Sequence, residues 1–367
     1  MVEVGSFLSG VKVVDLSHYV SGPVASQILA DMGAAVMKIE PPSGDGMCAL
    51  GPRNAGGDSV FYESLNAGKT VRRIDLKSAG GREIIEGLLA DADVLIEGFR
   101  PGVMTRLGLD YAALAPRNPA LIYCSISGYG TDGPLAEAAG HDGNYLAQSG
   151  ILHRNGGEAP VFFDPPIADM TGALYAAIAI LGALNARQRT GEGVQIELGL
   201  ADTLMPLQAM QVAEWGANGT VPTRRSTYLN GAAAYYNVYQ TRDARHVMLG
   251  PVEPRFWENF CAAANRQDWS SRQNDPMPQT DLIAEIATFF AGRTLPQIEA
   301  QFAHADCCLS PVLDLGEALS SEQVRARGFV LRADSAVQTL FPATFNGQRS
   351  APRAPLRVET EVCDART

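Results

Sequence analysis

Short apolar runs alternate with amphipathic stretches through the first half of the chain. Runs rich in Val, Ile and Leu and bounded by Gly, Pro or Asp are typical of buried strands, whereas apolar residues spaced three and four apart are typical of helices. The runs predict strands at Val11–Leu16, Ala35–Ile39, Thr70–Leu76, Val94–Glu97 and Leu121–Ile126. The stretches between them predict helices at Pro23–Met32, Gly80–Ala90 and Leu107–Leu114. This alternation favours an α/β fold with a Rossmann-like parallel sheet.

The second half of the chain has a different pattern. Residues Asp169–Arg187 predict a long apolar helix, and Val194–Leu198 a strand. Ala201–Gly216 predicts another helix, which Pro206 should kink or delay. After a looser stretch, the pattern predicts a hairpin of Ala234–Gln240 with His246–Leu249, and helices at Glu253–Ala264, Thr280–Ala291 and Leu295–His304. We therefore expect a large domain at residues 1–200, a linker helix at 201–225, a small α+β domain at 226–325 and a tail at 326–367.

Composition narrows the classes of protein to consider. The chain of 367 residues is 46% hydrophobic and 19% charged, as in ordinary globular proteins, and its net charge is −11. A nucleic-acid partner is not expected, because such binders present a basic face. The first residues lack the pattern of a signal peptide, and the most apolar stretch, Gly172–Ala186, is interpreted as a core helix too short to span a membrane. The six cysteines have neither metal-ligand nor disulfide spacing, so we expect no metal and a cytoplasmic location.

One motif resembles a dinucleotide-binding site. Gly128, Gly130 and Gly133 fit the G-x-G-x-x-G spacing and follow a predicted strand. Pro134 comes next, the residues after it are a poor start for a helix, and no acidic residue stands where a ribose would need one. The motif is therefore interpreted as a glycine-rich turn at the carboxyl end of a strand.

Three residues are candidates for chemistry. His141 lies in the polar, glycine-flanked segment Gly140–Tyr145, although a lone histidine is more often structural. Asp169 begins an apolar helix, where a plain helix cap is the simpler interpretation and a carboxyl with a raised pKa is the functional one. Glu253 is either a first-turn helix acid or a group that orients a histidine. The cations that could meet an anionic ligand, or could equally be surface charges, are Lys69, Arg72, Arg73, Lys77, Arg100 and Arg106.

Several long motifs, in order along the chain, resemble the family III CoA-transferases, the CaiB/BaiF group. The resemblance covers about residues 8–330. The segments that carry it are Asp75–Ser78, Ala92–Gly102, Leu107–Gly108, Ser127–Gly130 with Gly133–Pro134, Gly140–Asp142, Thr190–Gly193, Ala234–Tyr239, Glu253–Phe256 and Pro311–Val312.

The resemblance implies one of two chemistries. Transferases of this group use an aspartate, here matched by Asp169, as a nucleophile. The α-methylacyl-CoA racemases pair that aspartate with a histidine, here matched by His141, and move the α-proton of the thioester between the two. Glu253 matches a glutamate that supports the histidine. We expect epimerisation of a 2-methylacyl-CoA, with CoA transfer between carboxylic acids as the alternative and a non-catalytic CoA-binding protein as the third.

The resemblance also implies how the substrate is bound and how the chain assembles. No cofactor is expected, because coenzyme A enters as part of the acyl-CoA. The family fold is a large and a small domain, with the tail returning to the large one, and two chains interlock into a homodimer. A racemase arginine that contacts the CoA phosphates falls at Pro41, so we expect either that Lys38 or Arg53 substitutes for it or that the pocket differs. The positions matching CoA contacts are Ile74, Asp75, Leu76, Lys77, Gly98, Phe99, Arg100, Arg106, Gly140, Asp142, Asn144 and Tyr145.

Overall fold

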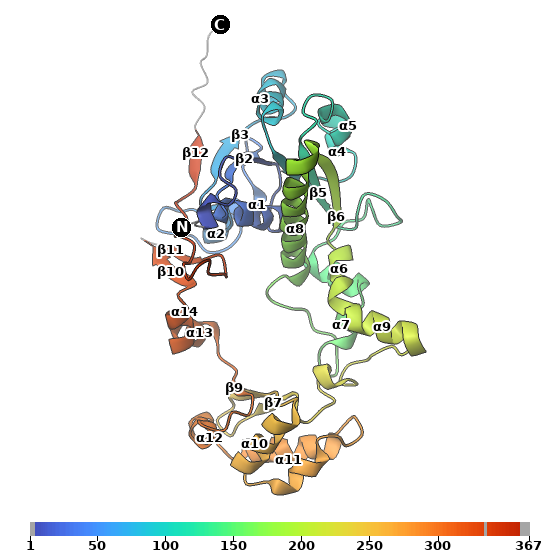
Figure 1. Cartoon of the computed structure of the whole chain (residues 1–367), viewed down its shortest axis with the longest axis vertical. Coiled ribbons are helices and arrows are strands. Elements are labelled where there is room, and N and C mark those ends of the chain that lie inside the picture. The colour runs from blue at the N-terminus through green and yellow to red at the C-terminus, as the bar shows by residue number, and fades with distance from the viewer. Residues whose placement is uncertain (1–3, 334–335, 360–367) are drawn as a thin grey trace. The chain divides into compact units, whose positions relative to one another are not determined.

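The computed structural model describes residues 4–333 and 336–359 (Figure 1). The chain divides into two compact units. Unit 1 comprises Met1–Ser149, Phe163–Leu207 and Gln323–Thr367, and unit 2 comprises Gly150–Phe162 and Gln208–Glu322.

Unit 1 is built on a seven-stranded sheet in which every described pair of strands is parallel. The strands are β1 (Lys12–Asp15), β2 (Ala35–Glu40), β3 (Thr70–Arg73), β4 (Val94–Glu97), β5 (Ile122–Ser127), β6 (Val194–Gly199) and β12 (Arg357–Glu359). Their order is β12-β3-β2-β1-β4-β5-β6. Without β12 this is the doubly wound order of the Rossmann fold, which confirms the predicted fold class.

Helices cover both faces of this sheet. The helices of unit 1 are α1 (Ser21–Asp31), α2 (Val60–Asn66), α3 (Ala79–Ala90), α4 (Val103–Leu107), α5 (Tyr111–Leu114), α6 (Asp142–Gln148), α8 (Ile167–Thr190) and α14 (Glu322–Arg327). Ile85 and Leu89 of α3, with Met104 of α4, join sheet residues such as Leu95 in one buried cluster. On the other face α8 packs against α1, β5 and β6. A short hairpin of β10 (Val330–Ala333) and β11 (Ala336–Thr339) completes the unit.

The strand order fixes where a ligand should bind. Strands β1, β2 and β3 follow one another toward one edge of the sheet, and β4, β5 and β6 follow one another toward the other edge. The order of the strands therefore reverses between the neighbours β1 and β4. In open parallel sheets, ligands bind outside the carboxyl ends of the strands at such a switch point. The turn after Asp15 and the turn after Glu97 therefore form the expected edge of the site.

The structure corrects two predicted helices. The predicted helix over 107–114 is two short helices, α4 and α5, because Gly108 takes φ +70° and ends the first. The predicted helix over 201–216 starts later, as α9 (Ala209–Asn218), after short 3-10 turns that include Pro206. A proline has no amide to donate and its ring blocks the preceding turn, so the regular helix begins beyond it.

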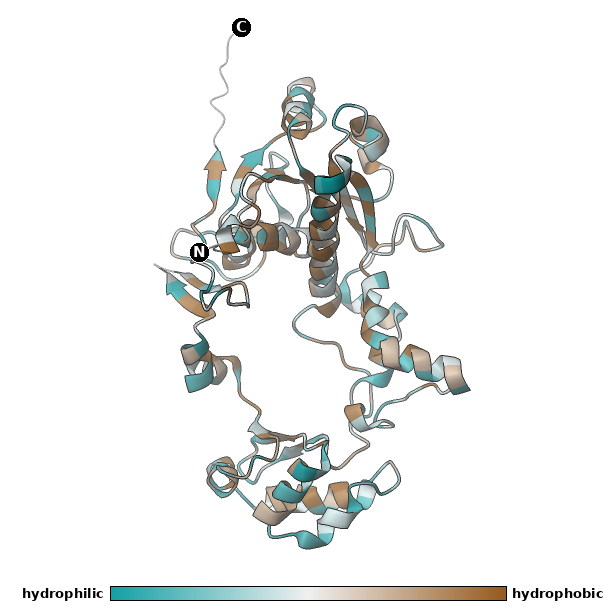
Figure 2. Cartoon of the chain, viewed as in Figure 1, coloured by the Kyte–Doolittle hydropathy of each residue, from teal (hydrophilic) through white to brown (hydrophobic). Residues whose placement is uncertain are grey.

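Helix α8 is longer than the apolar stretch that suggested it. At 24 residues it is long and apolar enough to cross a membrane by length and composition alone, so the prediction that it is too short was wrong. Figure 2 shows hydrophobic residues along α8 and the strands beside it. Ala173, Ala176 and Ile180 are fully buried, and the helix packs against the sheet. This packing is that of a core helix.

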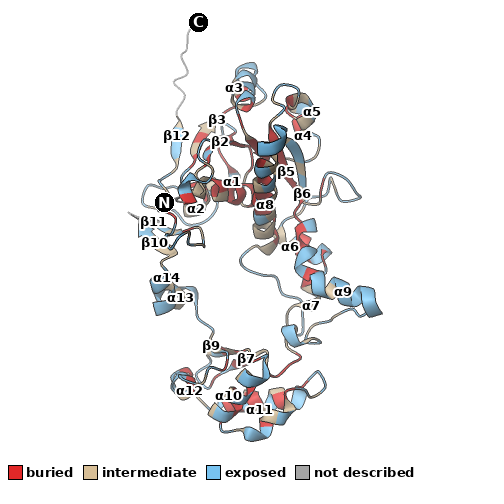
Figure 3. Ribbon diagram, viewed as in Figure 1, coloured by how far each residue is buried: buried red, intermediate tan, exposed pale blue. Residues whose placement is uncertain are grey.

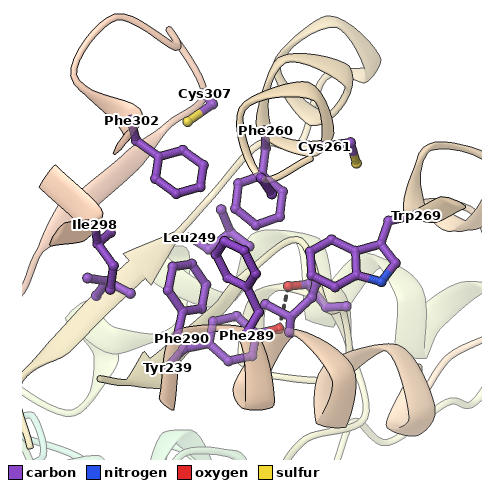
Figure 4. Packing of buried hydrophobic residues seen from close by; sticks show 14 of the residues in the cluster. Tyr239, Leu249, Phe260, Cys261, Trp269, Phe289, Phe290, Ile298, Phe302 and Cys307 are labelled. Atoms are coloured by element: carbon purple, nitrogen blue, oxygen red, sulfur yellow. Dashed lines mark hydrogen bonds between the residues drawn. The ribbon is translucent and has the colours of Figure 1, made fainter. Parts of the chain in front are cut away.

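Unit 2 has its own hydrophobic core. Its helices and strands are α7 (Ile151–Arg154), α9, β7 (Asn237–Gln240), β8 (His246–Leu249), α10 (Pro254–Ala263), α11 (Thr280–Ala291), α12 (Leu295–Phe302), β9 (Leu309–Pro311) and α13 (Leu315–Ser320). Strands β7, β8 and β9 form an antiparallel sheet, of which the sequence predicted only the first pair. Phe260 stacks on Trp269, Phe290 and Phe302 inside the core (Figure 4).

Candidate active site

The turn between β1 and α1 is held in place by Asp15, the last residue of β1. Asp15 is fully buried and accepts hydrogen bonds from the backbone amide and hydroxyl of Ser17, which lies in the turn. Burial raises the pKa of Asp15, but Lys38, Lys69 and the serine hydroxyls outweigh it, and the pKa lies below its usual value. An ionised aspartate therefore anchors the turn that leads into α1.

Two buried lysines complete this support. Lys38 Nζ donates to the carbonyl oxygen of Ser17 at 2.7 Å and lies 3.0 Å from Asp45. Lys69 Nζ donates to the carbonyl oxygen of Pro23 at 2.8 Å and lies 3.5 Å from Asp15. Burial lowers the pKa of Lys69 to about 7, against the pull of Asp15. Both lysines are fully buried, so neither can reach a ligand phosphate, and their expected role as anion-binding cations was wrong.

The turn after β4 faces the turn after β1. Glu97 is buried, and its Oε2 accepts from the backbone amide of Phe99 at 2.8 Å, which shapes the Gly98–Phe99 turn. Burial raises the pKa of Glu97. The Phe99 ring meets His18 edge-on, with ring centroids 5.1 Å apart. The two sides of the switch point thus touch through an aromatic contact.

His141 stands at the start of α6. Its backbone amide donates to Oδ1 of Asn144 at 3.0 Å, and its side chain is exposed. Tyr145 donates from its hydroxyl to the carbonyl oxygen of Gly140 at 2.7 Å and packs in the turn that follows β5. A Cβ at Gly128 would lie 2.6 Å from that hydroxyl, so the glycine is needed there for close packing. The glycine-rich segment that the sequence predicted to be a turn therefore packs around Tyr145.

Asp142 caps α8 from a different helix. Its Oδ1 accepts from the backbone amides of Ala168 at 2.6 Å and Asp169 at 3.2 Å. The residue preceding α8 is Pro166, which offers no side-chain cap. The capping function that local sequence suggested for Asp169 is thus performed by Asp142, and the Asp169 carboxyl is available for other contacts.

The Asp169 carboxyl reaches back to the switch point. Its Oδ1 accepts from the hydroxyl of Ser21, the first residue of α1, at 2.9 Å. Burial raises the pKa of Asp169, and the charge of Asp142 raises it further. The Ser21 hydrogen bond and the proximity of His141 act in the opposite direction, and the net shift is upward. Asp169 is therefore a half-buried carboxyl whose pKa lies above its usual value, which favours its protonated form more than in an exposed aspartate.

His141 and Asp169 can work together as a pair. Each lies at the start of a helix in unit 1, and they are close enough for the imidazole to lower the Asp169 pKa. Tyr145 is also near, because Asp169 contributes, after burial, to raising the pKa of that phenol to about 12. An imidazole and a carboxyl of this kind suit proton transfer or nucleophilic attack. Among residues 4–333 and 336–359 no cluster of side chains could hold a metal ion.

The other predicted binding residues follow the same edge of the sheet. Ile74 is buried directly after β3, and Asp75, Leu76 and Lys77 form the turn into α3, where Asp75 Oδ1 accepts from the Lys77 amide at 3.0 Å. Gly98, Phe99 and Arg100 follow β4, with Arg106 on α4. Arg100 and Arg106 are both exposed. A recess of about 660 Å³ lies elsewhere in unit 1, lined by residues such as Asp31 and Arg353, and none of the predicted binding residues lines it.

Two predicted residues stand apart. Glu253 belongs to unit 2, where it is the exposed residue before α10, and its action on His141 stays a prediction. Arg53 is exposed, and it donates to the carbonyl oxygen of Cys48 at 2.6 Å. Of the two expected substitutes for the arginine missing at Pro41, only Arg53 is exposed to a ligand.

The sequence-based interpretation assigned no chemistry to Ser21 or His18. Ser21 is separated from Asp169 by 148 residues, so no local pattern could join them. One indirect signal was available. The first helix after β1 and the turn after β4 both lie at the switch point of the predicted sheet, where ligands bind.

This chain is similar to known proteins over most of its length. Residues 8–357 match the model of the family described as CoA-transferase family III. The chain belongs to that family. It is therefore an enzyme of the superfamily that contains both CoA-transferases and α-methylacyl-CoA racemases.

Relatives from this family III group carry both activities. An acetyl-CoA:oxalate CoA-transferase from Acetobacter aceti is 33% identical, over 92% of this chain and 89% of the relative. An α-methylacyl-CoA racemase from Homo sapiens is 31% identical, over 89% of this chain and 83% of the relative. A solved CaiB/BaiF family protein from Brucella suis has a TM-score of 0.85 at 28% identity, and the match covers 95% of this chain and 96% of the other. The sequence identities to the transferase and to the racemase are too similar to decide between the two reactions. The choice therefore rests on the residues of the site.

Proposed function

We propose that this protein epimerises the α-carbon of a 2-methylacyl-CoA by proton transfer between His141 and Asp169. The observation that carries the proposal is the placement of these two groups: Asp142, which follows His141, accepts from the Asp169 backbone amide, and the Asp169 carboxyl accepts from Ser21 at the switch point of the sheet. One is an exposed imidazole at the start of α6, and the other is a half-buried carboxyl with a raised pKa. Two titratable groups in such different surroundings suit the two ends of a proton transfer.

The chemistry needs a base on one face of the α-carbon and an acid on the other. When the imidazole of His141 takes the α-proton, the electrons of the C–H bond move into the thioester and form an enolate. Protonated Asp169 then gives its proton to the opposite face and becomes a carboxylate. In the reverse direction the carboxylate of Asp169 is the base, and the imidazolium of His141 is the acid. Burial favours the protonated carboxyl, which the forward direction requires.

The substrate would be held along the carboxyl edge of the sheet. Lys77, Arg100 and Arg106 are exposed there and suit the CoA phosphates, which accept hydrogen bonds from Lys and Arg. Coenzyme A enters as part of the substrate, so the reaction requires no separate cofactor. We further propose a cytoplasmic homodimer, in which Glu253 supports His141.

CoA transfer is the second candidate, and two observations favour it. The relative from Acetobacter aceti is named for that reaction. In the described part of the chain, the one hydrogen bond to the Asp169 carboxyl engages Oδ1, which leaves Oδ2 available for attack on a thioester carbonyl. That attack would expel the CoA thiolate and form a mixed anhydride. The thiolate would then attack the aspartyl carbonyl, releasing the first carboxylate and leaving an aspartyl-CoA thioester.

The two candidates make different demands on His141. The test incubates purified protein with a panel of 2-methylacyl-CoA thioesters in deuterated water, with no acceptor acid, and follows deuterium at the α-carbon by mass spectrometry. We expect exchange with the wild type and a loss of at least 100-fold with His141→Ala, because a general base contributes rate factors of about that size or more.

A His153→Ala variant is the matched control, because His153 is an exposed histidine of α7 to which no role in the site is assigned. Absence of exchange over the whole panel, together with a hydroxylamine-sensitive adduct on Asp169 when an acceptor acid is added, would replace the racemase proposal by the transferase one.

A further inference from the structure

We infer that Ser21 is a positioning residue for Asp169, and that its hydroxyl selects which carboxyl oxygen of Asp169 reacts. The inference rests on the proposed function, since it needs Asp169 to be the reacting group, and it holds for either candidate chemistry. The observation behind it is the hydrogen bond of 2.9 Å from the Ser21 hydroxyl to Oδ1 of Asp169. It joins the first turn of α1 to the first turn of α8.

The Ser21 hydroxyl is held in place by its surroundings. Ser21 is 8% exposed, and it follows the turn that Asp15 and Lys38 anchor through Ser17. The next residue, Gly22, packs so closely on Ser17 that a Cβ would lie 2.1 Å from the Ser17 hydroxyl oxygen. The backbone at the start of α1 therefore has little room to move.

Ser21 uses its side chain in an unusual way for a residue at a helix start. Serines near helix N-termini commonly accept hydrogen bonds from the free amides of their own helix. Here the hydroxyl instead donates to a carboxylate on another helix, and the residue before α1, Val20, has no side-chain cap. The Asp169 carboxyl thus lies within hydrogen-bond distance of the first residue of α1, and this hydrogen bond favours its charged form.

Two consequences follow for the reaction. A donor on Oδ1 fixes the rotation of the carboxyl, so Oδ2 is the oxygen left to take a proton or to attack. The same donor stabilises the carboxylate over the carboxylic acid, which opposes the effects of burial and of Asp142. Ser21 therefore sets both the orientation and the protonation of Asp169 without touching the substrate.

The experiment compares Ser21→Ala, Ser21→Thr and Ser21→Val with the wild type. Thr and Val have nearly the same shape, and only Thr keeps the hydroxyl. In the reactions that use the Asp169 carboxylate, which are CoA transfer and the direction of epimerisation in which Asp169 is the base, we expect Ala and Val to raise the pH at which activity falls on the acidic side by about one unit. We expect them to lower kcat/KM about tenfold, with Thr restoring most of both. Ser64→Ala is the matched control, because its exposed hydroxyl binds a carbonyl within α2.

A second measurement needs no substrate. A water-soluble carbodiimide labels protonated carboxyls, so the extent of Asp169 labelling, read by peptide mass spectrometry, falls as the pH rises through the Asp169 pKa. We expect the midpoint to move upward in the Ala and Val variants and to stay in place in the Thr and Ser64→Ala variants.

The two measurements separate the possible failures. Unchanged labelling midpoints and pH profiles in both Ala and Val overturn the inference. A wild type that turns over no acyl-CoA but whose Ala and Val variants show the shifted midpoint overturns the proposed function and leaves the link between Ser21 and Asp169 standing. A Val variant that behaves like Thr shows that shape, and not the hydroxyl, matters, and it also overturns the inference.

Discussion

Two neighbouring residues, Ser21 and Asp142, shift the pKa of Asp169 in opposite directions. The Ser21 hydroxyl favours its charged form, whereas the carboxylate of Asp142 disfavours it. Asp142 is itself held by the amides of Ala168 and Asp169, although burial raises its pKa. A reacting carboxyl placed between a donor and a like charge can be shifted in either direction by one substitution.

Asp142→Asn should move the Asp169 pKa downward. An asparagine oxygen can still accept from the amides of Ala168 and Asp169, so the cap on α8 remains while the like charge is removed. In the reactions that use the Asp169 carboxylate, the acidic fall-off of activity should therefore shift to lower pH, opposite to the shift expected of Ser21→Ala. The pH profile of kcat/KM from pH 4.5 to 9 measures it.

Asp142→Ala separates the charge from the cap. It removes both, so the free energy of unfolding, measured with urea, should fall by about 1 kcal/mol more than in the Asn variant. An Asn variant with the wild-type pH profile would mean that the Asp142 charge does not act on Asp169.

The sequence could single out His141 and Asp169 as candidates, but it could not show which residues contact Asp169. Both stood out as polar residues beside apolar runs, and the family motifs gave them roles. Ser21 and Lys38 act through contacts across the fold, and Lys38 resembled any other cation until its burial was known. Residue type and spacing show that a group is present, but its partners depend on which strands become neighbours.

At the level of elements, the apolar runs predicted the strands well because a buried parallel strand must be apolar on both faces. The structure shortens the predicted strand over 70–76 to β3, and the helix α2 was not predicted. The predicted helices were wrong where a single residue ended or delayed a helix, as Gly108 and Pro206 do. The parallel pairing of β12 with β3 joins segments nearly 300 residues apart, and no local pattern could show it.

Lys38→Met tests whether the support under the β1–α1 turn stabilises the fold. The substitution leaves Asp45 buried without its cation and removes the donor to the Ser17 carbonyl. Breaking a buried pair in this way costs about 3 kcal/mol or more. The urea midpoint followed by far-UV circular dichroism should fall accordingly.

Two comparisons show whether burial is the cause. Lys38→Met combined with Asp45→Asn should recover part of the loss, because the amide keeps an acceptor for the Met47 backbone amide without the charge. Arg117→Met breaks the exposed pair with Glu86 and should cost less than about 1 kcal/mol. Equal losses from Lys38→Met and Arg117→Met would contradict the proposed support.

At the scale of the whole molecule, each of the two units exposes large apolar side chains. Helix α9 has no buried residue and is pale blue in Figure 3, and Met210 and Trp215 on it are 62% and 60% exposed. Leu174 and Ile178 of α8 are likewise exposed. Large apolar side chains gathered on exposed helices are typical of protein interfaces. A second copy of this chain, as proposed above, is the partner that would cover them.

The proposed dimer predicts a change in the surroundings of Trp215. Light scattering should give twice the chain mass of 39.1 kDa, and dilution should move the tryptophan emission to longer wavelength as Trp215 becomes exposed to water. Trp257 and Trp269 are buried in the core of unit 2, so Trp215→Phe should abolish the wavelength shift while leaving the dimer intact.

Met210→Glu combined with Val212→Glu should weaken the dimer by more than tenfold, because two charges would be buried in an apolar contact. A protein that stays at 39.1 kDa at every concentration would exclude the dimer.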